Sequence, residues 1–170
     1  MAETRAVIAT VQGLGRLLLR GDTAVIQAAG AAFGVPIPTL ACRAEFQPPR
    51  AALWLGPDEF LLLLPEAWVA DTVATMTVAL AALHHALVDI GQRQLALVVE
   101  GADAAALLNA GCPLDLDEAL FPVNTSTRTL LGKAEIVLWR MAADRFHLEV
   151  GRSFLPYVRA FLADAARGLA

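Results

Sequence analysis

The three histidines are the side chains in this sequence best suited to bind a transition metal or to exchange a proton near neutral pH. His84 and His85 are adjacent, and His147 lies far along the chain. Adjacent side chains diverge on a helix and point to opposite faces of a strand, so such a pair is poorly placed to hold one ion. The sequence therefore predicts no metal site, and we expect one exposed and one hydrogen-bonded histidine here.

The adjacent carboxylates Asp58 and Glu59 are the candidates for general acid and base chemistry. They belong to Gly56-Pro57-Asp58-Glu59, in which proline fixes φ and aspartate favours a turn. Carboxylates in such a turn are normally solvated. We expect Asp58, and Asp144 in the second half, to accept backbone hydrogen bonds of the turn.

The remaining short motifs do not match a known catalytic or cofactor site. Gly13-x-Gly15 lacks the third glycine of a dinucleotide loop and precedes a strand instead of following it. The two cysteines, Cys42 and Cys112, have no spacing typical of zinc or redox sites, and we expect both to be reduced and buried. No catalytic, cofactor-binding or metal-binding residue is predicted on this chain.

Composition excludes one class of partner and suggests another. The net charge of −4 disfavours nucleic acid, whose binding requires a cationic surface. The apolar fraction is 57% and the charged fraction 18%, whereas soluble domains average about 45–50% apolar. We therefore expect part of this apolar surface to be covered by another polypeptide, or by a second copy when the chain is isolated.

The chain has no pattern typical of export or of a membrane span. Its first residues, MAETRAVIATVQGLGRLLL, lack a basic region followed by an uninterrupted apolar core. The longest charge-free segment, residues 72–88, is 17 residues long and contains two histidines and three threonines, so it is too short and too polar for a confident span. We expect a cytoplasmic protein that does not enter the membrane.

The hydrophobic periodicity predicts an α+β fold in which helices cover a largely antiparallel sheet. The first half begins with a strand at 14–20 and a helix that Asp22 caps, and 36–50, with its four prolines, is expected to be an irregular connection. We expect Asp103 to cap a short helix and Ser153 to cap the last one. The other expected elements are strands at 51–55, 60–64, 86–90, 94–99, 127–131, 135–141 and 145–150, and a helix with Val69, Val73, Met76, Leu80 and Leu83 on one face.

Two short sequence segments recur along the chain. LWLGPDEFLLL from Leu53 returns as LWRMAADRFHLEV from Leu138, which places Trp54 and Trp139 85 residues apart, and Gly21 and Gly101 of a second pair of segments are 80 apart. This spacing predicts one domain over residues 1–170 that contains two pseudo-repeats of βαββα type, at about 14–85 and 86–170. For a partner surface we select Phe46, Trp54 and Trp68, because desolvated aromatic residues concentrate binding energy.

Several motifs in order resemble the gamma subunit family of heterotetrameric sarcosine oxidase, over nearly the whole chain. The combination of GCPLDL with the closing RSF-x-x-Y is specific to that family, and Phe60 stands where tryptophan is common. The matching segments are LLLRGD (17–22), ALWLGPDEFLLL (52–63), VDIGQRQLAL (88–97), GCPLDL (111–116), TLLGKAEIVLWR (129–140) and RSFLPYV (152–158).

The resemblance implies a fold related to the folate-binding domain of the glycine-cleavage aminomethyltransferases. It also implies assembly with alpha, beta and delta subunits into an enzyme that demethylates sarcosine to glycine, formaldehyde and hydrogen peroxide, and that yields methylenetetrahydrofolate when tetrahydrofolate is present. FAD, FMN and NAD would belong to the alpha and beta subunits and zinc to delta. The gamma chain would be a companion without an active site.

Two other functions are compatible with the sequence. The fold analogy suggests a folate-dependent one-carbon transferase acting alone, although fold alone does not establish function. The doubled pattern also allows a homodimeric regulatory module that binds a small molecule between its halves.

Overall fold

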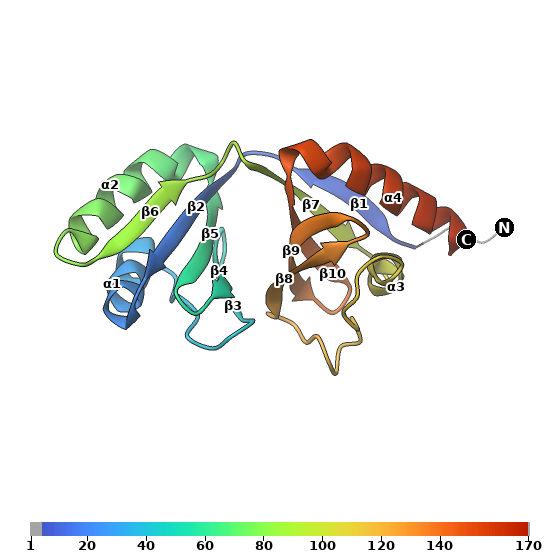
Figure 1. Ribbon diagram of the computed structural model, residues 1–170, viewed down its shortest axis with the longest axis horizontal. Helices are drawn as coiled ribbons and strands as arrows, with labels where there is room; N and C mark the ends of the chain where they lie inside the picture. The colour runs from blue at the N-terminus through green and yellow to red at the C-terminus, as the bar shows by residue number, and fades with distance from the viewer. Residues whose placement is uncertain (1–4, 170) are drawn as a thin grey trace. The chain divides into compact units, whose positions relative to one another are not determined.

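The computed structural model describes residues 5–169, so that residues 1–4 of the N-terminal stretch considered above lie outside it. The chain forms two compact units (Figure 1). The middle unit is Gly13–Gly91, and the terminal unit combines the segment that ends at Gln12 with the segment that begins at Gln92. Both units are α+β, as predicted.

The middle unit contains an antiparallel five-stranded sheet in the order β3-β4-β5-β2-β6. Alternate strand residues face helices α1 and α2 and form a core with them, which includes Leu17, Phe33, Phe60 and Met76. The elements are β2 (Leu14–Gly21), α1 (Thr23–Phe33), β3 (Ala44–Gln47), β4 (Arg50–Gly56), β5 (Glu59–Pro65), the 3₁₀ helix η1 (Glu66–Trp68), α2 (Val69–Leu80) and β6 (His85–Asp89).

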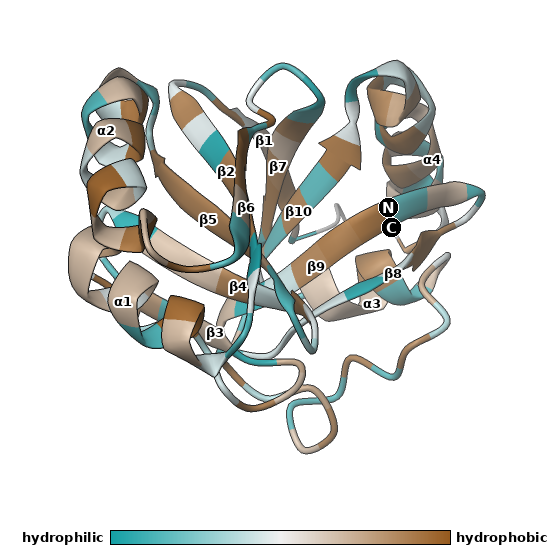
Figure 2. Cartoon of the chain, turned by 60° about the vertical axis from the view of Figure 1, so that its left-hand side comes forward, coloured by the Kyte–Doolittle hydropathy of each residue, from teal (hydrophilic) through white to brown (hydrophobic). Residues whose placement is uncertain are grey.

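The terminal unit contains a second antiparallel sheet in the order β1-β7-β10-β9-β8. Its helix-side core includes Leu97, Leu138, Phe146 and Leu162, and β9, like β5 of the middle unit, is hydrophobic over most of its length (Figure 2). The elements are β1 (Val7–Val11), β7 (Gln94–Glu100), α3 (Ala104–Asn109), β8 (Ser126–Leu131), β9 (Ala134–Ala142), β10 (Arg145–Gly151), the 3₁₀ helix η2 (Arg152–Phe154) and α4 (Leu155–Gly168).

The two units share one strand order, and each receives its edge strand from the other half of the chain. β1 precedes β2 in sequence but pairs with β7, and β6 precedes β7 but pairs with β2. Each half therefore reads ββαβββα, with its first strand exchanged. The expected βαββα unit lacked β1 and β3. Both are short edge strands, and β3 lies in the proline-rich stretch that was expected to be irregular, where edge positions tolerate nearby prolines.

Equivalent backbone hydrogen bonds recur in the two units. The N–H of Gly21 donates to the carbonyl of Asp58 at 3.1 Å, and the N–H of Gly101 donates to the carbonyl of Asp144 at 2.9 Å. A second matching pair runs from Glu66 N to Gly13 O at 2.8 Å and from Arg152 N to Arg93 O at 3.0 Å. These bonds support an internal duplication, which stays a prediction together with the single-domain organisation over 1–170.

Trp54 and Trp139, the tryptophans of the recurring segments, do not occupy equivalent positions in the two sheets. Trp54 pairs with Phe60 across the first hairpin, whereas Phe146 pairs with Arg140 across the second. Because alternate residues face opposite sides of a sheet, Trp139 lies on the other face from Arg140. The expected Trp54–Trp139 match is therefore shifted by one residue.

Two of the three predicted helix caps are wrong. Asp22 caps α1 as expected, with Oδ1 accepting from the N–H groups of Ala24 at 3.0 Å and Val25 at 3.1 Å. Asp103 instead accepts from the backbone and guanidinium of Arg5, which β1 brings beside it. Ser153 lies inside η2, and no side chain caps the start of α4.

Candidate functional site

The histidines take the structural positions expected for the adjacent pair. His84 is exposed, and His85 Nδ1 lies 2.9 Å from the carbonyl oxygen of Leu83. Within residues 5–169, no group of three or more His, Cys, Asp and Glu side chains is arranged to hold a metal ion.

A buried polar pair on β10 was missed by the sequence analysis. His147 Nε2 lies 2.8 Å from Glu149 Oε1, and the two side chains are 5% and 0% exposed. The His147 ring also lies 5.9 Å from that of Trp139, its cross-strand neighbour. The signal was the alternation Phe-His-Leu-Glu-Val, which places both polar residues on the face of β10 opposite the helices. A buried carboxylate requires such hydrogen bonds, so the pair has a structural explanation.

The other candidate reactive groups also have structural contacts. Asp58 was expected to accept backbone bonds through its carboxylate, but that carboxylate pairs with Arg20 at 3.1 Å on the surface. It is the carbonyl of Asp58, like that of Asp144, that accepts a backbone bond. Cys112 is buried as expected, with Sγ 3.8 Å from Thr129 Oγ1, whereas Cys42 is half-buried.

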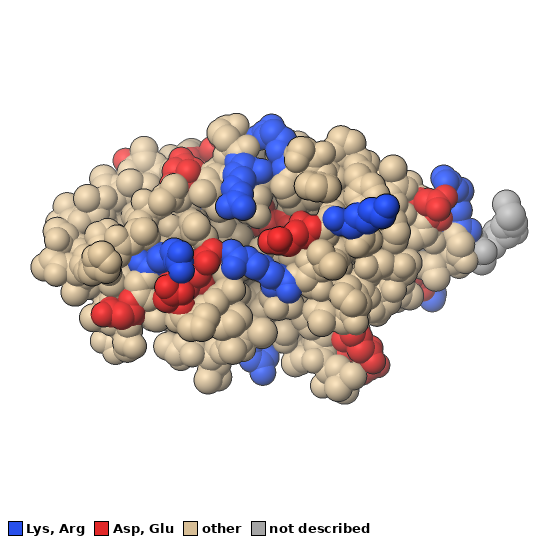
Figure 3. All heavy atoms as spheres, viewed as in Figure 1, with Lys and Arg blue, Asp and Glu red and all other residues tan. Residues whose placement is uncertain are grey.

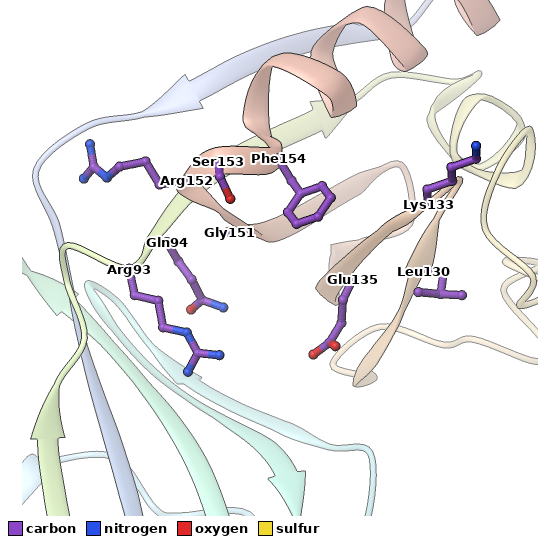
Figure 4. Close-up of a pocket in the computed structure, with 9 residues that line it drawn as sticks. All are labelled: Arg93, Gln94, Leu130, Lys133, Glu135, Gly151, Arg152, Ser153 and Phe154. Carbon is purple, nitrogen blue, oxygen red and sulfur yellow. The ribbon is translucent and has the colours of Figure 1, made fainter.

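A hollow of about 900 Å³ lies at one end of the terminal unit's sheet, on the face opposite α3 and α4 (Figure 4). Its floor contains Gln94 and Gly151, which are cross-strand neighbours on β7 and β10, and Glu135 and Leu130, which are neighbours on β9 and β8. The hollow therefore crosses the ends of four strands, and η2 closes one side of it with Phe154.

Charged side chains surround this hollow. Arg93, Lys133 and Arg152 contribute positive charge and Glu135 the one carboxylate of its lining. Arg152 donates to the carbonyl and the side-chain oxygen of Gln92 at 3.0 and 3.3 Å, so its guanidinium is bound to neutral groups. Figure 4 shows Arg93 and Glu135 extending toward the same open space from opposite sides. An anion with apolar groups beside it would fit this lining.

The three residues predicted for a partner surface do not form one patch. Phe46 pairs with Ala51, and Trp54 lies an odd number of residues further along β4, so Phe46 and Trp54 are on opposite faces of the sheet. Trp54 is half-buried against the helix-side core. Trp68 is 42% exposed, and its ring stacks 5.1 Å from the guanidinium carbon of Arg50. Phe46 is 40% exposed.

Exposed apolar side chains occur in both units. The most exposed are Val78 at 79%, Leu40 at 69%, Val7 at 68% and Leu120 at 68%. Most of the face drawn in Figure 3 is uncharged, with acidic and basic side chains interspersed. Among the described residues, every helix is too short or too polar to cross a bilayer.

The sequence matches the family model for the sarcosine oxidase gamma subunit over residues 20–168. A sarcosine oxidase subunit gamma from Corynebacterium sp. (strain P-1) is 33% identical over 115 residues, which are 68% of this chain and 56% of that relative. The corresponding subunit from Corynebacterium sp. (strain U-96) is 34% identical over 115 residues. The chain thus spans about half the length of the curated relatives that it matches.

Solved structures agree with the sequence match. A chain of the heterotetrameric sarcosine oxidase from Corynebacterium sp. U-96, in complex with pyrrole 2-carboxylate, superposes on 99% of this chain with a TM-score of 0.92 and 29% identity, and 87% of that chain is covered. Aminomethyltransferase T of the glycine cleavage system from Bartonella henselae has a TM-score of 0.72 at 12% identity, over 94% of this chain and 46% of that one, and shares the fold. From its sequence and its fold, the chain belongs to the sarcosine oxidase gamma subunit family.

Proposed function

We propose that this chain is the gamma subunit of a heterotetrameric sarcosine oxidase and supports the oxidative demethylation of sarcosine to glycine, formaldehyde and hydrogen peroxide without catalysing it. The observation that carries the proposal is the superposition on a chain of such an enzyme over 99% of the residues, with a TM-score of 0.92. The backbone of this chain therefore follows that of a chain of the assembled enzyme over nearly its whole length.

The contacts of the ionisable side chains are consistent with a companion role. His147 with Glu149, Asp103 with Arg5, and Asp58 with Arg20 each form pairs within one unit. These pairs stabilise strands or join a strand to a loop, and Asp103 and Asp58 lie at the surface of their units. These ionisable side chains therefore have a role in stabilising the fold.

The proposed partners are the alpha, beta and delta subunits, which would hold FAD, FMN, NAD and zinc and would use tetrahydrofolate as the acceptor of the one-carbon unit. The enzyme would act in the cytoplasm. Phe46, Trp54 and Trp68 stay the predicted partner residues. Of these, Phe46 and Trp68 have the larger accessible surface, so we expect them to contribute more binding energy than Trp54.

Coexpression with the other three subunits tests the proposal. With the chain present, we expect a complex that contains all four subunits and oxidises sarcosine, as measured by hydrogen peroxide release. Without it, we expect less soluble complex and correspondingly less activity per cell, while the chain alone releases no peroxide. A fully active, equally soluble enzyme formed without the chain would contradict the proposal.

The alternative of a folate-dependent transferase or a small-molecule regulatory module is tested by calorimetry on the isolated chain. Titration with tetrahydrofolate to millimolar concentration is expected to give no heat of binding. We expect none because fold similarity at 12% identity does not extend to ligand specificity. A saturable isotherm would instead favour the alternative.

A further inference from the structure

The hollow on the terminal unit combines a surplus of positive charge with two accessible apolar side chains. Leu130 and Phe154 are 47% and 48% exposed, although both are large and apolar. They lie in the same lining as Arg93, Lys133 and Arg152. Exposed apolar groups beside unneutralised charge are typical of a surface that another molecule covers.

The basic side chains of the hollow differ from three of the six other basic side chains in the terminal unit. Outside it, Arg5, Arg145 and Arg167 each form an ion pair with a carboxylate of the same unit. Arg93 and Lys133 have no ion pair within residues 5–169, and the guanidinium of Arg152 donates its hydrogen bonds to the neutral Gln92. Although the whole chain carries a net charge of −4, the lining of the hollow has three basic residues and one carboxylate, and this local positive surface is complementary to an acidic ligand.

The distances along the sheet indicate the length of that ligand. Arg93 directly precedes β7, and Lys133 lies in the turn between β8 and β9, two to three strands away in the order β7-β10-β9-β8. At about 4.8 Å between strands, this is roughly 10–14 Å, the span of three or four residues of extended chain. A volume of about 900 Å³ is large enough for a short peptide segment.

We propose that this hollow binds an extended acidic segment of a partner subunit. Two carboxylates three or four residues apart would pair with Arg93 and Lys133, and an apolar side chain between them would contact Phe154 and Leu130. Glu135 would disfavour a segment that carries a carboxylate at the centre, and so would select for this spacing. The inference rests on the proposed function, since it assigns one of the surfaces through which the subunit would assemble.

A charge-reversal pair tests the proposal. In the variant Arg93→Glu with Lys133→Glu, we expect the affinity of the chain for the complex of the other subunits to fall at least tenfold. A control with equal net charge, Arg145→Glu with Arg167→Glu, changes exposed residues of the same unit outside the hollow and should bind within about twofold of wild type. The difference should narrow as salt is raised, because exposed charges are screened.

The outcomes separate the two proposals. Equal binding by wild type, variant and control overturns the acidic-segment assignment and leaves the gamma-subunit function intact. Failure of the wild-type chain itself to bind overturns the function. Thermal unfolding of each variant checks that the fold is kept, and the mutated side chains are exposed, so little change is expected.

Photocrosslinking in the assembled enzyme identifies the segment independently of affinity. With a benzophenone amino acid in place of Phe154, we expect a crosslink to a partner peptide that contains two Asp or Glu residues three or four positions apart. A crosslink to a basic or uncharged peptide, or no crosslink to a partner in a complex that contains the chain, would overturn the proposal.

Discussion

The two units carry different residues at one equivalent position of their sheets. Trp54 of the middle unit lies opposite Phe60 and is half-buried against the helix-side core. Arg140 of the terminal unit lies opposite Phe146, and its guanidinium carbon is 4.9 Å from the centre of that ring. The same sheet position is therefore occupied by an aromatic side chain in one unit and by a buried cation in the other.

The difference shows how one framework can hold different loops. Arg140 is 4% exposed, and its Nη1 donates to the carbonyls of Leu116 at 3.0 Å and Phe121 at 2.8 Å. Its Nε and Nη2 donate to Ala143 in the hairpin turn. Arg140 thus fixes the loop that contains the GCPLDL motif, whereas Trp54 contributes mainly apolar contact.

Replacing Arg140 is expected to produce the largest effect. In Arg140→Met, the carbonyls of Leu116 and Phe121 lose their donor in a buried site, and we expect the free energy of unfolding of the terminal unit to fall by about 3–5 kcal/mol. Trp54→Met, at the equivalent position, removes partly exposed apolar surface and should lower the stability of the middle unit by about 1 kcal/mol. Denaturant unfolding with hydrogen exchange resolved by unit measures both. Equal losses would contradict the distinction between them.

Substitution of the equivalent glycines Gly21 and Gly101 by alanine is expected to give the next largest difference in lost stability between the two units. A Cβ at Gly101, whose φ is +128°, would lie 1.9 Å from the carbonyl oxygen of Arg5, and a Cβ at Gly21 would lie 2.5 Å from the side chain of Val25. Gly101→Ala combines an unfavourable φ with a backbone clash and should lower stability by about 3 kcal/mol. Gly21→Ala is expected to lower it by about 1–2 kcal/mol. Thermal denaturation that ranks Gly21→Ala as the more damaging change would contradict this reading.

Asp22 and Asp103 follow the two glycines and have different roles. Asp22 caps α1, so Asp22→Ala should lower the free energy of unfolding by about 1 kcal/mol. Asp22→Asn preserves an acceptor oxygen at the cap and serves as the matched control, with a smaller loss expected. If the two variants are equally destabilised in urea titrations, the capping bond is not the cause.

Asp103 stabilises the folded chain by an amount that depends on pH. The side-chain hydrogen bond from Arg5, followed by the bond from its backbone N–H, lowers the pKa of Asp103 below the ordinary 3.8. A depressed pKa stabilises the folded state above the unfolded pKa, and this stabilisation is lost as the pH falls through the folded pKa. Asp103→Asn should therefore be less stable than wild type at pH 7, by a gap that narrows below about pH 4. Unfolding measured from pH 7 to pH 3 tests this, and a gap independent of pH would contradict it.

Local patterns predicted the elements that local interactions specify. Asp22, the buried face Val25, Ile26, Ala29 and Phe33, and the left-handed Gly34 define α1 as expected. The hairpin at Pro57 and Asp58 was also predicted correctly. These features depend on residues within a few positions of one another, so the sequence contains the necessary information.

Features that depend on distant residues were missed. β1 pairs with β7, about ninety positions away, so its five residues carry no local signal of their partner. Arg5 reaches Asp103 only through that pairing and so removes the predicted cap. The site prediction was limited for the same reason. Phe46 and Trp54 are close in sequence but face opposite sides of the sheet, and the hollow draws its lining from four strands.

We propose that this two-unit chain functions by assembling with other subunits into a sarcosine oxidase. Native mass spectrometry of the enzyme purified through a tag on another subunit measures whether the chain is present and in how many copies. We predict a heterotetramer that contains one copy of this 18.0 kDa chain. A sarcosine-oxidising complex whose mass excludes the chain would show that the chain is not one of its subunits.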